Sequence, residues 1–293
     1  MPSLKDVKKK IESVEKTKQI TKAMNMVASA KLRRAQERIE RFRPYADKYY
    51  EILKDLSKGV DSSVHPLLEP RPEIKTSCII LITSERGLCG AFNVNLINKA
   101  TKLVQEKQAK GIAVKMIGVG RKAAQAARKI EGVEVMNSYV GVMDRFDFTL
   151  ANQIGKEIIK AYEDHMLDEV ILVYGQLVTL LRQDPVALQL LPVVQPEGEK
   201  EEKSEPKALY MYEPSVEGLL GELLPRFVKV QIYRGLLDTS ASEHAARMTA
   251  MDTAAKNCEE MIDKLTLAYN KARQAAITAE LLDIVGGAEA LKG

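Results

Sequence analysis

The feature that most constrains the fold is an apolar seam in the first part of the chain. Alternating steps of three and four residues from Leu4 to Leu56 reach apolar side chains at thirteen of sixteen positions. That spacing, kept over several heptads, is the pattern of a coiled-coil helix. Ser3 is a good N-cap, and Gly59 with the prolines that follow it ends the pattern, while Pro44 predicts a local bend. The segment therefore predicts one very long helix.

The same alternation returns at the other end of the chain, from Leu223 to Asp283. Pro225 falls near its start, and two glycines at 286–287 end it. Two helices of similar length, each with a seam, are predicted to pair with each other. If both termini lie at one tip and the intervening segment at the other, the pair must be antiparallel.

The first seam loses its apolar character at Lys18, Thr21 and Asn25, which are consecutive seam positions. Either the seam opens there to a partner, or polar residues fix its register. From Lys16 to Arg34 there are six cations and no acid. Such a block indicates a solvated face, a nucleic-acid surface or a surface for acidic protein partners. No aromatic residue is interleaved with these cations, which argues against single-strand binding.

Between the two helical segments the hydrophobic period changes repeatedly. Buried-strand patterns alternate with amphipathic helices, which predicts an α/β domain built on a small doubly wound sheet. The predicted strands are 78–84, 114–120, 133–140, 169–178 and 186–194, and the predicted helices are 93–108, 121–130 and 146–164. Residues 195–207 are charged and poor in apolar side chains, and they indicate an exposed loop or linker. The predicted divisions are helix 1–58, linker 59–75, α/β domain 76–208 and helix 209–293.

A parallel sheet raises the question of nucleotide binding. The chain has no G-x-x-x-x-G-K-[ST] loop; "GVGR" (118–121) gives only G-x-G, and "RGLCGAFN" (86–93) fits neither phosphate-binding fingerprint. These glycines indicate tight strand-to-helix turns. The three histidines, His65, His165 and His244, are dispersed and fit no catalytic or metal-ligand spacing. We expect no catalytic residue, no metal and no cofactor.

Three cysteines, Cys78, Cys89 and Cys258, lie far apart and predict neither a disulfide framework nor a zinc site. No apolar run approaches the roughly 20 residues of a membrane span, and the N-terminus lacks a signal-peptide pattern. The chain is expected to be soluble and cytoplasmic. A basic coiled-coil adaptor or nucleic-acid-binding protein, and more weakly a nucleotide-dependent enzyme, stay open on these grounds alone.

Several longer stretches carry a family resemblance. They are "ITKAMNMVASAKLRRAQ" (20–36), "SERGLCGAFN" (84–93), "YMYEP" (210–214) and "SEHAARMTAMDTAAKNCEEMIDKLTLAYNKARQAAITAELLDIVGGAEAL" (242–291). Together they resemble the gamma subunit of the F-type ATP synthase of bacteria, and the similarity covers nearly the whole chain.

The resemblance implies a fold and a role. The terminal helices would form the rotating shaft inside a hexamer of three alpha and three beta subunits, and a Rossmann-like central domain would bind no nucleotide. The chain would be non-catalytic and would use no cofactor. The epsilon subunit and the c-ring of Fo would be further partners, with no nucleic acid and with membrane contact only through the complex. The complex would lie on the cytoplasmic face of the bacterial plasma membrane.

The resemblance also assigns residues. Contacts with the alpha and beta subunits would come from Lys22, Met24, Lys31, Arg33, Arg34, Arg86, Gly87, Cys89, Arg273, Gln274 and Thr278. Among these, the group from Lys31 to Arg34 and the loop 86–89 would approach an acidic lever loop of the beta subunit. Tyr210 and Glu213 would form the foot that faces the c-ring and epsilon.

Two positions depart from the family pattern. Glu85 stands where the family often has Asp, and Ala91 stands where it often has Gly. Ala91 would be strained if the backbone there needed a positive φ. The regulatory cysteine insertion of the chloroplast form is absent, so thiol control is not expected.

Overall fold

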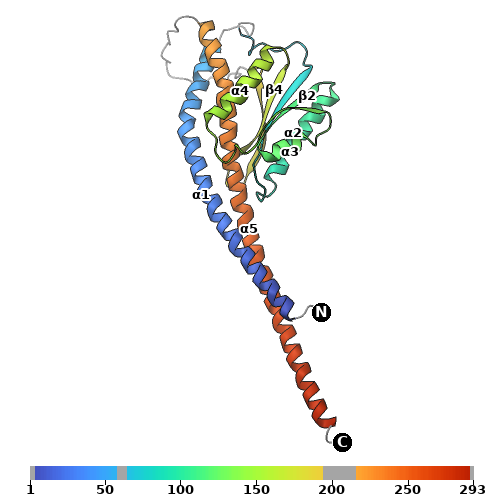
Figure 1. Cartoon of the computed structure of the whole chain (residues 1–293). Coiled ribbons are helices and arrows are strands. Elements are labelled where there is room, and N and C mark those ends of the chain that lie inside the picture. The colour runs from blue at the N-terminus through green and yellow to red at the C-terminus, as the bar shows by residue number, and fades with distance from the viewer. Residues whose placement is uncertain (1–3, 58–64, 194–215, 291–293) are drawn as a thin grey trace, which may run out of the picture. The chain divides into compact units, whose positions relative to one another are not determined.

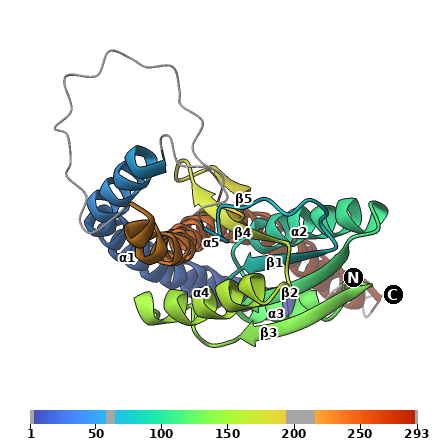
Figure 2. The same ribbon diagram turned by 90° about the horizontal axis from the view of Figure 1, so that it is seen from above.

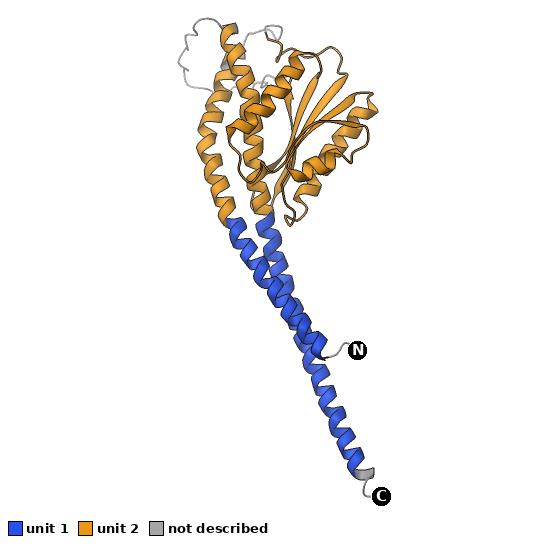
Figure 3. Ribbon diagram, in the orientation of Figure 1, with its two compact units in different colours: residues 1–29, 247–293 blue, residues 30–246 orange. Residues whose placement is uncertain are grey.

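The computed structural model describes residues 4–57, 65–193 and 216–290. The chain divides into two compact units, drawn in blue and orange in Figure 3. Unit 1 comprises residues 1–29 and 247–293, and unit 2 comprises residues 30–246. Two long helices supply residues to both units: α1 (Leu4–Ser57) and α5 (Val216–Ala290). Both helices continue through their internal prolines, Pro44 and Pro225.

Between the long helices, strands and helices alternate (Figure 1). They are β1 (Thr76–Ile82), α2 (Phe92–Ala109), β2 (Ala113–Val119), α3 (Arg121–Ala127), β3 (Val133–Tyr139), α4 (Phe148–Glu163), β4 (Glu169–Leu177) and β5 (Gln183–Leu191). The predicted strands and helices agree with these bounds to within three residues at every end. The α/β class predicted from the hydrophobic period is confirmed.

The strands form one sheet with the order β3-β2-β1-β4-β5. The first four strands run parallel, but β5 pairs with β4 in the antiparallel direction. The expectation of a parallel sheet is therefore wrong for this edge strand. The reason is the length of the connection: residues 178–182 are enough for a hairpin, whereas a parallel strand needs a long crossover.

Each face of the sheet has its own hydrophobic core, and Figure 2 shows the helices that cover them. On one face, Cys78, Ile80 and Ile82 of β1 pack with α4, α5 and the end of α1. On the other face, Ile79 and Leu81 of the same strand pack with α2 and α3. A strand that is buried on both faces has no polar alternation, which explains the continuous apolar run in the sequence.

The first half of α5 belongs to the α/β unit. Gly235 lets the helix approach the sheet, because a Cβ there would lie 2.9 Å from Cδ2 of Leu172. One turn further on, the backbone N–H of Gly175 donates to Oγ1 of Thr239, and Oγ of Ser242 donates to the Gly175 carbonyl oxygen. The seam pattern predicted coiled-coil pairing for this segment but gave no sign that its other faces would cover a sheet.

The G-x-G of residues 118–120 makes a tight turn between β2 and α3. A Cβ on Gly118 would lie 2.9 Å from the backbone nitrogen of Ala124. Gly120 has φ of 92°, and a Cβ there would overlap the carbonyl oxygen of Thr83. Both glycines are therefore required by close backbone packing, in agreement with the predicted tight strand-to-helix turn.

In unit 1, α1 and α5 pair in the antiparallel direction. Asn25 contacts Met248, and Lys18, seven residues earlier in α1, contacts Glu259, which is later in α5. The predicted α1 seam is confirmed, because all sixteen α1 positions from Leu4 to Leu56 are buried or half-buried. The predicted α5 seam is wrong at Arg234, Ala279 and Asp283, which are exposed, and α5 continues past the two glycines at 286–287 to Ala290.

The last turns of α5 have a different environment. All residues from 279 to 288 are exposed, and several of them are large and apolar: Leu281, Leu282, Ile284 and Val285. Within the described residues, no helix has the length and apolar character needed to cross a bilayer.

Candidate functional site

The polar interruption of the α1 seam has an internal explanation in unit 1. Nδ2 of Asn25 donates to the carbonyl oxygen of Met248 on the facing helix at 2.8 Å. Nζ of Lys18 forms an ion pair with Oε1 of Glu259, also at 2.8 Å, and this contact lowers the pKa of the Glu259 carboxyl. The Thr21 hydroxyl donates within its own helix, to the carbonyl oxygen of Lys18. Of the two alternatives, the register explanation accounts for these residues, since Asn25 and Lys18 join the helices at defined heights.

The other predicted contact residues of unit 1 form two separate groups. Lys22 is exposed and Met24 is half-buried on α1, at the height of the Asn25–Met248 contact. Arg273, Gln274 and Thr278 are exposed on the last part of α5, and the Thr278 hydroxyl donates to the Gln274 carbonyl oxygen. In the antiparallel pair, α5 continues past the beginning of α1, so the two groups do not meet (Figure 1).

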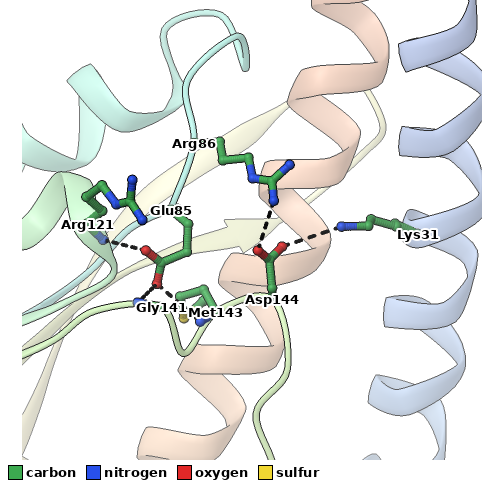
Figure 4. Close-up of polar contacts among 7 residues, drawn as sticks. All are labelled: Lys31, Glu85, Arg86, Arg121, Gly141, Met143 and Asp144. Atoms are coloured by element: carbon green, nitrogen blue, oxygen red, sulfur yellow. Dashed lines mark hydrogen bonds and ion pairs between the residues drawn. The ribbon is translucent and has the colours of Figure 1, made fainter.

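In unit 2, the buried carboxylate of Glu85 joins the loops that follow β1 and β3 (Figure 4). Its Oε1 accepts hydrogen bonds from the backbone N–H groups of Gly141 and Met143, at 2.8 and 3.3 Å. Its Oε2 accepts from the backbone N–H of Arg121 at the start of α3, at 3.1 Å. The parallel strands end at this edge of the sheet, so their loops gather here.

The backbone of the 84–93 loop is sharply turned. Leu88 and Gly90 have positive φ, of 62° and 58°, whereas Ala91 has φ of −83° and ψ of 0°. The strain that a positive φ would have caused at Ala91 is therefore absent, and Leu88 carries an uncommon conformation in its place. Leu88 is also exposed.

Within the same loop, the predicted contact residues have different environments. Arg86 and Gly87 are exposed, but Cys89 is buried in the core beside α2. Nδ2 of Asn93 donates to Sγ of Cys89 at 3.0 Å. Cys89 therefore holds the loop against the sheet, and its thiol does not face solvent.

Asp144, in the loop after β3, links the two cationic segments of unit 2 (Figure 4). Its Oδ1 lies 3.4 Å from Nζ of Lys31 on α1, and its Oδ2 lies 3.6 Å from Nη2 of Arg86. Arg33 pairs with Glu37 on its own helix at 3.5 Å, and Arg34 is exposed. The structure thus joins Lys31 and Arg86, which the sequence had placed on separate segments.

Two further contacts hold the 140–147 loop. Nη2 of Arg38 donates to the carbonyl oxygen of Phe146 at 2.7 Å, and the guanidinium lies over the Phe146 ring at 4.4 Å. Asp147 caps α4 by accepting from the Thr149 N–H at 2.9 Å. The loop is therefore fixed at Glu85, at Arg38 and at the beginning of α4, while the Asp144 side chain stays exposed.

Sequence reasoning missed Asp144 and the anchoring role of Glu85. The available signal was positional: both residues follow strands predicted to be parallel, and such strands place their following loops at one edge of the sheet. The predicted foot residues, Tyr210 and Glu213, lie outside the described residues.

The arrangement suits reversible contacts between proteins. Its polar groups are exposed cations with one bridging carboxylate, carried by a helix and two anchored loops. Among the described residues, no group of three or more metal-ligating side chains comes together. The fold and this surface define a class of protein: one with two long paired helices and an α/β domain that carries exposed cationic side chains.

Comparisons with known proteins identify the family. The family model described as ATP synthase matches residues 3–291. The ATP synthase gamma chain of Maridesulfovibrio salexigens is 62% identical over 293 residues, which are 100% of both chains, and that of Lawsonia intracellularis is 54% identical with the same coverage. The chain belongs to the ATP synthase gamma chain family.

A solved structure shares the fold. A chain in the Euglena gracilis mitochondrial ATP synthase, in a structure of OSCP, F1 and c-ring, aligns with a TM-score of 0.68 at 23% identity. The alignment covers 98% of this chain and 94% of that chain. A second structure, of the rotor of the same Euglena enzyme, aligns with a TM-score of 0.60 at 22% identity and covers 94% of this chain and 98% of that chain.

Proposed function

We propose that this chain is the central rotor shaft of an F-type ATP synthase and that it couples rotation to ATP synthesis or hydrolysis in its partner subunits. The observation that carries the proposal is 62% identity to a gamma chain along the whole of both sequences. The chain is a non-catalytic subunit, and the chemical step belongs to its partners.

A rotating shaft must be slender and must not bind tightly in one orientation to the hexamer that surrounds it. Each fully buried Leu would stabilise one orientation by roughly 1.5–3 kcal/mol, so several such contacts would stop rotation. Small residues support a slim rod: Ala28, Ala30, Ala272, Ala275, Ala276 and Ala279. The Asn25–Met248 hydrogen bond fixes the register of the pair, so that a twist applied to one helix is passed to the other.

Transmission of a push requires contacts that form and release. Exposed ion pairs contribute only about 0–1 kcal/mol each, because water screens them. We propose that Lys31, Arg33, Arg34 and Arg86 make such contacts with acidic groups of the beta subunits. Support comes from their exposure and from the joining of Lys31 and Arg86 at Asp144.

The remaining assignments extend this proposal to unit 1 and to the partner complex. Lys22, Met24, Arg273, Gln274 and Thr278 would contact the hexamer of three alpha and three beta subunits, and Gly87 and Cys89 would shape the loop that carries Arg86. Tyr210 and Glu213 would meet the c-ring and epsilon. The complex would lie on the cytoplasmic face of the bacterial plasma membrane. The helical segments 1–58 and 209–293 would form the shaft, and the α/β domain 76–208, preceded by the linker 59–75, would form the lobe.

The coupling follows from differential binding. An asymmetric shaft contacts one conformation of a catalytic subunit better than another, so each orientation favours a different state at each of the three sites. Ion flow through the ring would turn the shaft in one direction, and ATP hydrolysis would turn it in the other.

Co-expression with cognate alpha and beta subunits tests the proposal. The complex is purified through a tag on beta, and its mass and ATPase activity are measured with and without this chain. We expect one copy per three alpha–beta pairs and an activity that depends on it. Failure to co-purify, or binding in equal numbers to beta, would contradict the shaft role.

A further inference from the structure

Asp144 occupies the position between Lys31 and Arg86 where an external anion would bind. Its two carboxylate oxygens face one cation each, at 3.4 and 3.6 Å. The three side chains together carry a net charge of +1, so the cluster still attracts an anion. An acid supplied by the chain itself therefore competes for the same cations as an acid supplied by a partner.

The geometry of the cluster favours exchange. The side chains of Lys31, Asp144 and Arg86 are 45%, 44% and 78% exposed, and both ion pairs are longer than the 2.8 Å of Lys18–Glu259. Exposed pairs of this kind contribute about 0–1 kcal/mol, so a second carboxylate can replace Asp144 with little net change in free energy.

The backbone beneath Asp144 is fixed, in contrast to its side chain. Glu85 accepts from the N–H of Met143, directly before Asp144, and Arg38 donates to the carbonyl oxygen of Phe146, two residues after it. When the carboxylate leaves the cations it therefore stays within reach, and it can return without rearrangement of the loop.

We propose that Asp144 is an internal counter-ion that holds Lys31 and Arg86 together and is exchanged for a carboxylate of an acidic partner segment at each engagement. This inference rests on the proposed function and adds a release mechanism to it. When the partner carboxylate moves away, Asp144 returns to Lys31 and Arg86 and restores the two ion pairs.

The test combines two measurements on the full chain. The first is the affinity of a synthetic Glu/Asp-rich peptide for the wild type and for Asp144→Asn, measured by calorimetry at low and high salt. We expect Asp144→Asn to bind about two- to fivefold more tightly at low salt, the factor that corresponds to one exposed ion pair, and to lose this gain at high salt. The second is co-purification of each variant with alpha and beta.

Glu131→Gln is the matched control, because it removes one exposed carboxylate from a loop outside the cluster. It should leave the affinity unchanged, which separates the position from net charge. In a Lys31→Gln, Arg86→Gln background, Asp144→Asn should have no effect.

Equal affinity of Asp144→Asn and the wild type, or weaker binding by Asp144→Asn, would overturn the exchange. If the chain does not assemble with alpha and beta while the peptide result stands, the shaft role fails and the exchange is retained. If it assembles and the peptide result is negative, the exchange alone fails.

Discussion

At the scale of single residues, the buried carboxylate of Glu85 positions the loops that carry the exposed side chains of Arg86 and Asp144. Its two oxygens accept three backbone N–H groups from two segments of the chain. The Glu85 side chain spans the distance between the β1 loop, the start of α3 and the β3 loop.

Replacing Glu85 by Gln tests this role. The amide group brings N–H donors to a position that faces backbone N–H groups, so at least one of those groups loses its acceptor. We expect Glu85→Gln to lower the free energy of unfolding by about 1–3 kcal/mol, the cost of an unsatisfied buried polar group. Urea denaturation measures the change, and Glu131→Gln, on an exposed residue, should alter stability little. An unchanged midpoint for Glu85→Gln would refute the anchoring role.

Asp238 on α5 makes stability depend on pH. Burial raises the pKa of its carboxyl from 3.8 to about 6, against the opposing effect of Arg234 and Arg43. The charged groups that line the same small cavity are Arg43, Asp47 and Arg234. Because the folded chain keeps this proton more tightly than the unfolded chain does, the contribution of Asp238 to stability falls as the pH rises from about 4 to about 6 and then levels off.

Asp238→Asn should remove this penalty. We expect it to raise the free energy of unfolding at pH 8 by on the order of 1–3 kcal/mol and to give no gain near pH 4, where the aspartic acid is protonated in the folded chain. Denaturation curves at the two pH values measure the difference. Asp47→Asn, on an exposed residue of the same cavity, serves as the control. An equal gain at both pH values would show that the effect does not come from ionisation.

At the scale of elements, the turn between β2 and α3 depends on glycine for two reasons, and the chain offers a control that separates them. Gly120 and Gly111 both have positive φ, of 92° and 74°, but only Gly120 lies against another backbone segment. We expect Gly111→Ala to cost about 1–2 kcal/mol through its backbone conformation alone. Gly120→Ala should cost about 1–3 kcal/mol more, because its Cβ overlaps the Thr83 carbonyl oxygen and its φ of 92° with ψ of 151° lies in a region that essentially only glycine adopts. Thermal unfolding of both variants measures the difference, and equal costs would contradict the packing argument.

The α1–α5 pair offers a second comparison between two polar seam residues. The Asn25 amide reaches the facing helix, whereas the Thr21 hydroxyl bonds within α1. Asn25→Leu should keep the helices paired but broaden their register, while Thr21→Val should leave the register narrow. Spin labels at exposed Lys22 and Glu260, in a Cys258→Ser background, would report the distance distribution. Equally narrow distributions for both variants would show that Asn25 does not set the register.

The local spacing of apolar residues was sufficient to predict most helices and strands, because an element that is buried on one or two faces has apolar residues at a characteristic spacing. The continuous run of β1 and the seam of α1 are examples. Patterns could not predict that the first half of α5 covers the sheet at Gly175, or that Asp144 would meet Lys31, which lies 113 residues away in the sequence. Such contacts depend on the tertiary arrangement of the chain. The sequence pattern of the seam or loop would be the same whether or not these contacts formed.

At the scale of the whole molecule, we expect the end of α5 to matter for assembly with the partner subunits but not for the folding stability of the isolated chain. Residues 279–288 are exposed and bury no side chain in the described structure. Removing residues 279–293 should therefore leave the unfolding midpoint of the isolated chain nearly unchanged, but it should reduce retention in the hexamer and the ATPase activity of the complex. Met251→Ala, at a buried seam position, serves as the contrasting control, because it should lower the unfolding midpoint of the isolated chain. A large loss of midpoint on truncation would mean that the segment is part of the folded core.

The exposed end of α5 also has a consequence for the life of the chain in the cell. A short helical segment without a partner frays, and one with Leu281, Leu282, Ile284 and Val285 on its surface offers apolar sequence to chaperones and proteases. Covering the segment in a complex removes that signal. Unassembled copies would then be recognised and degraded, while assembled copies would persist, so that the same residues would let the cell match the amount of this subunit to the amount of its partners.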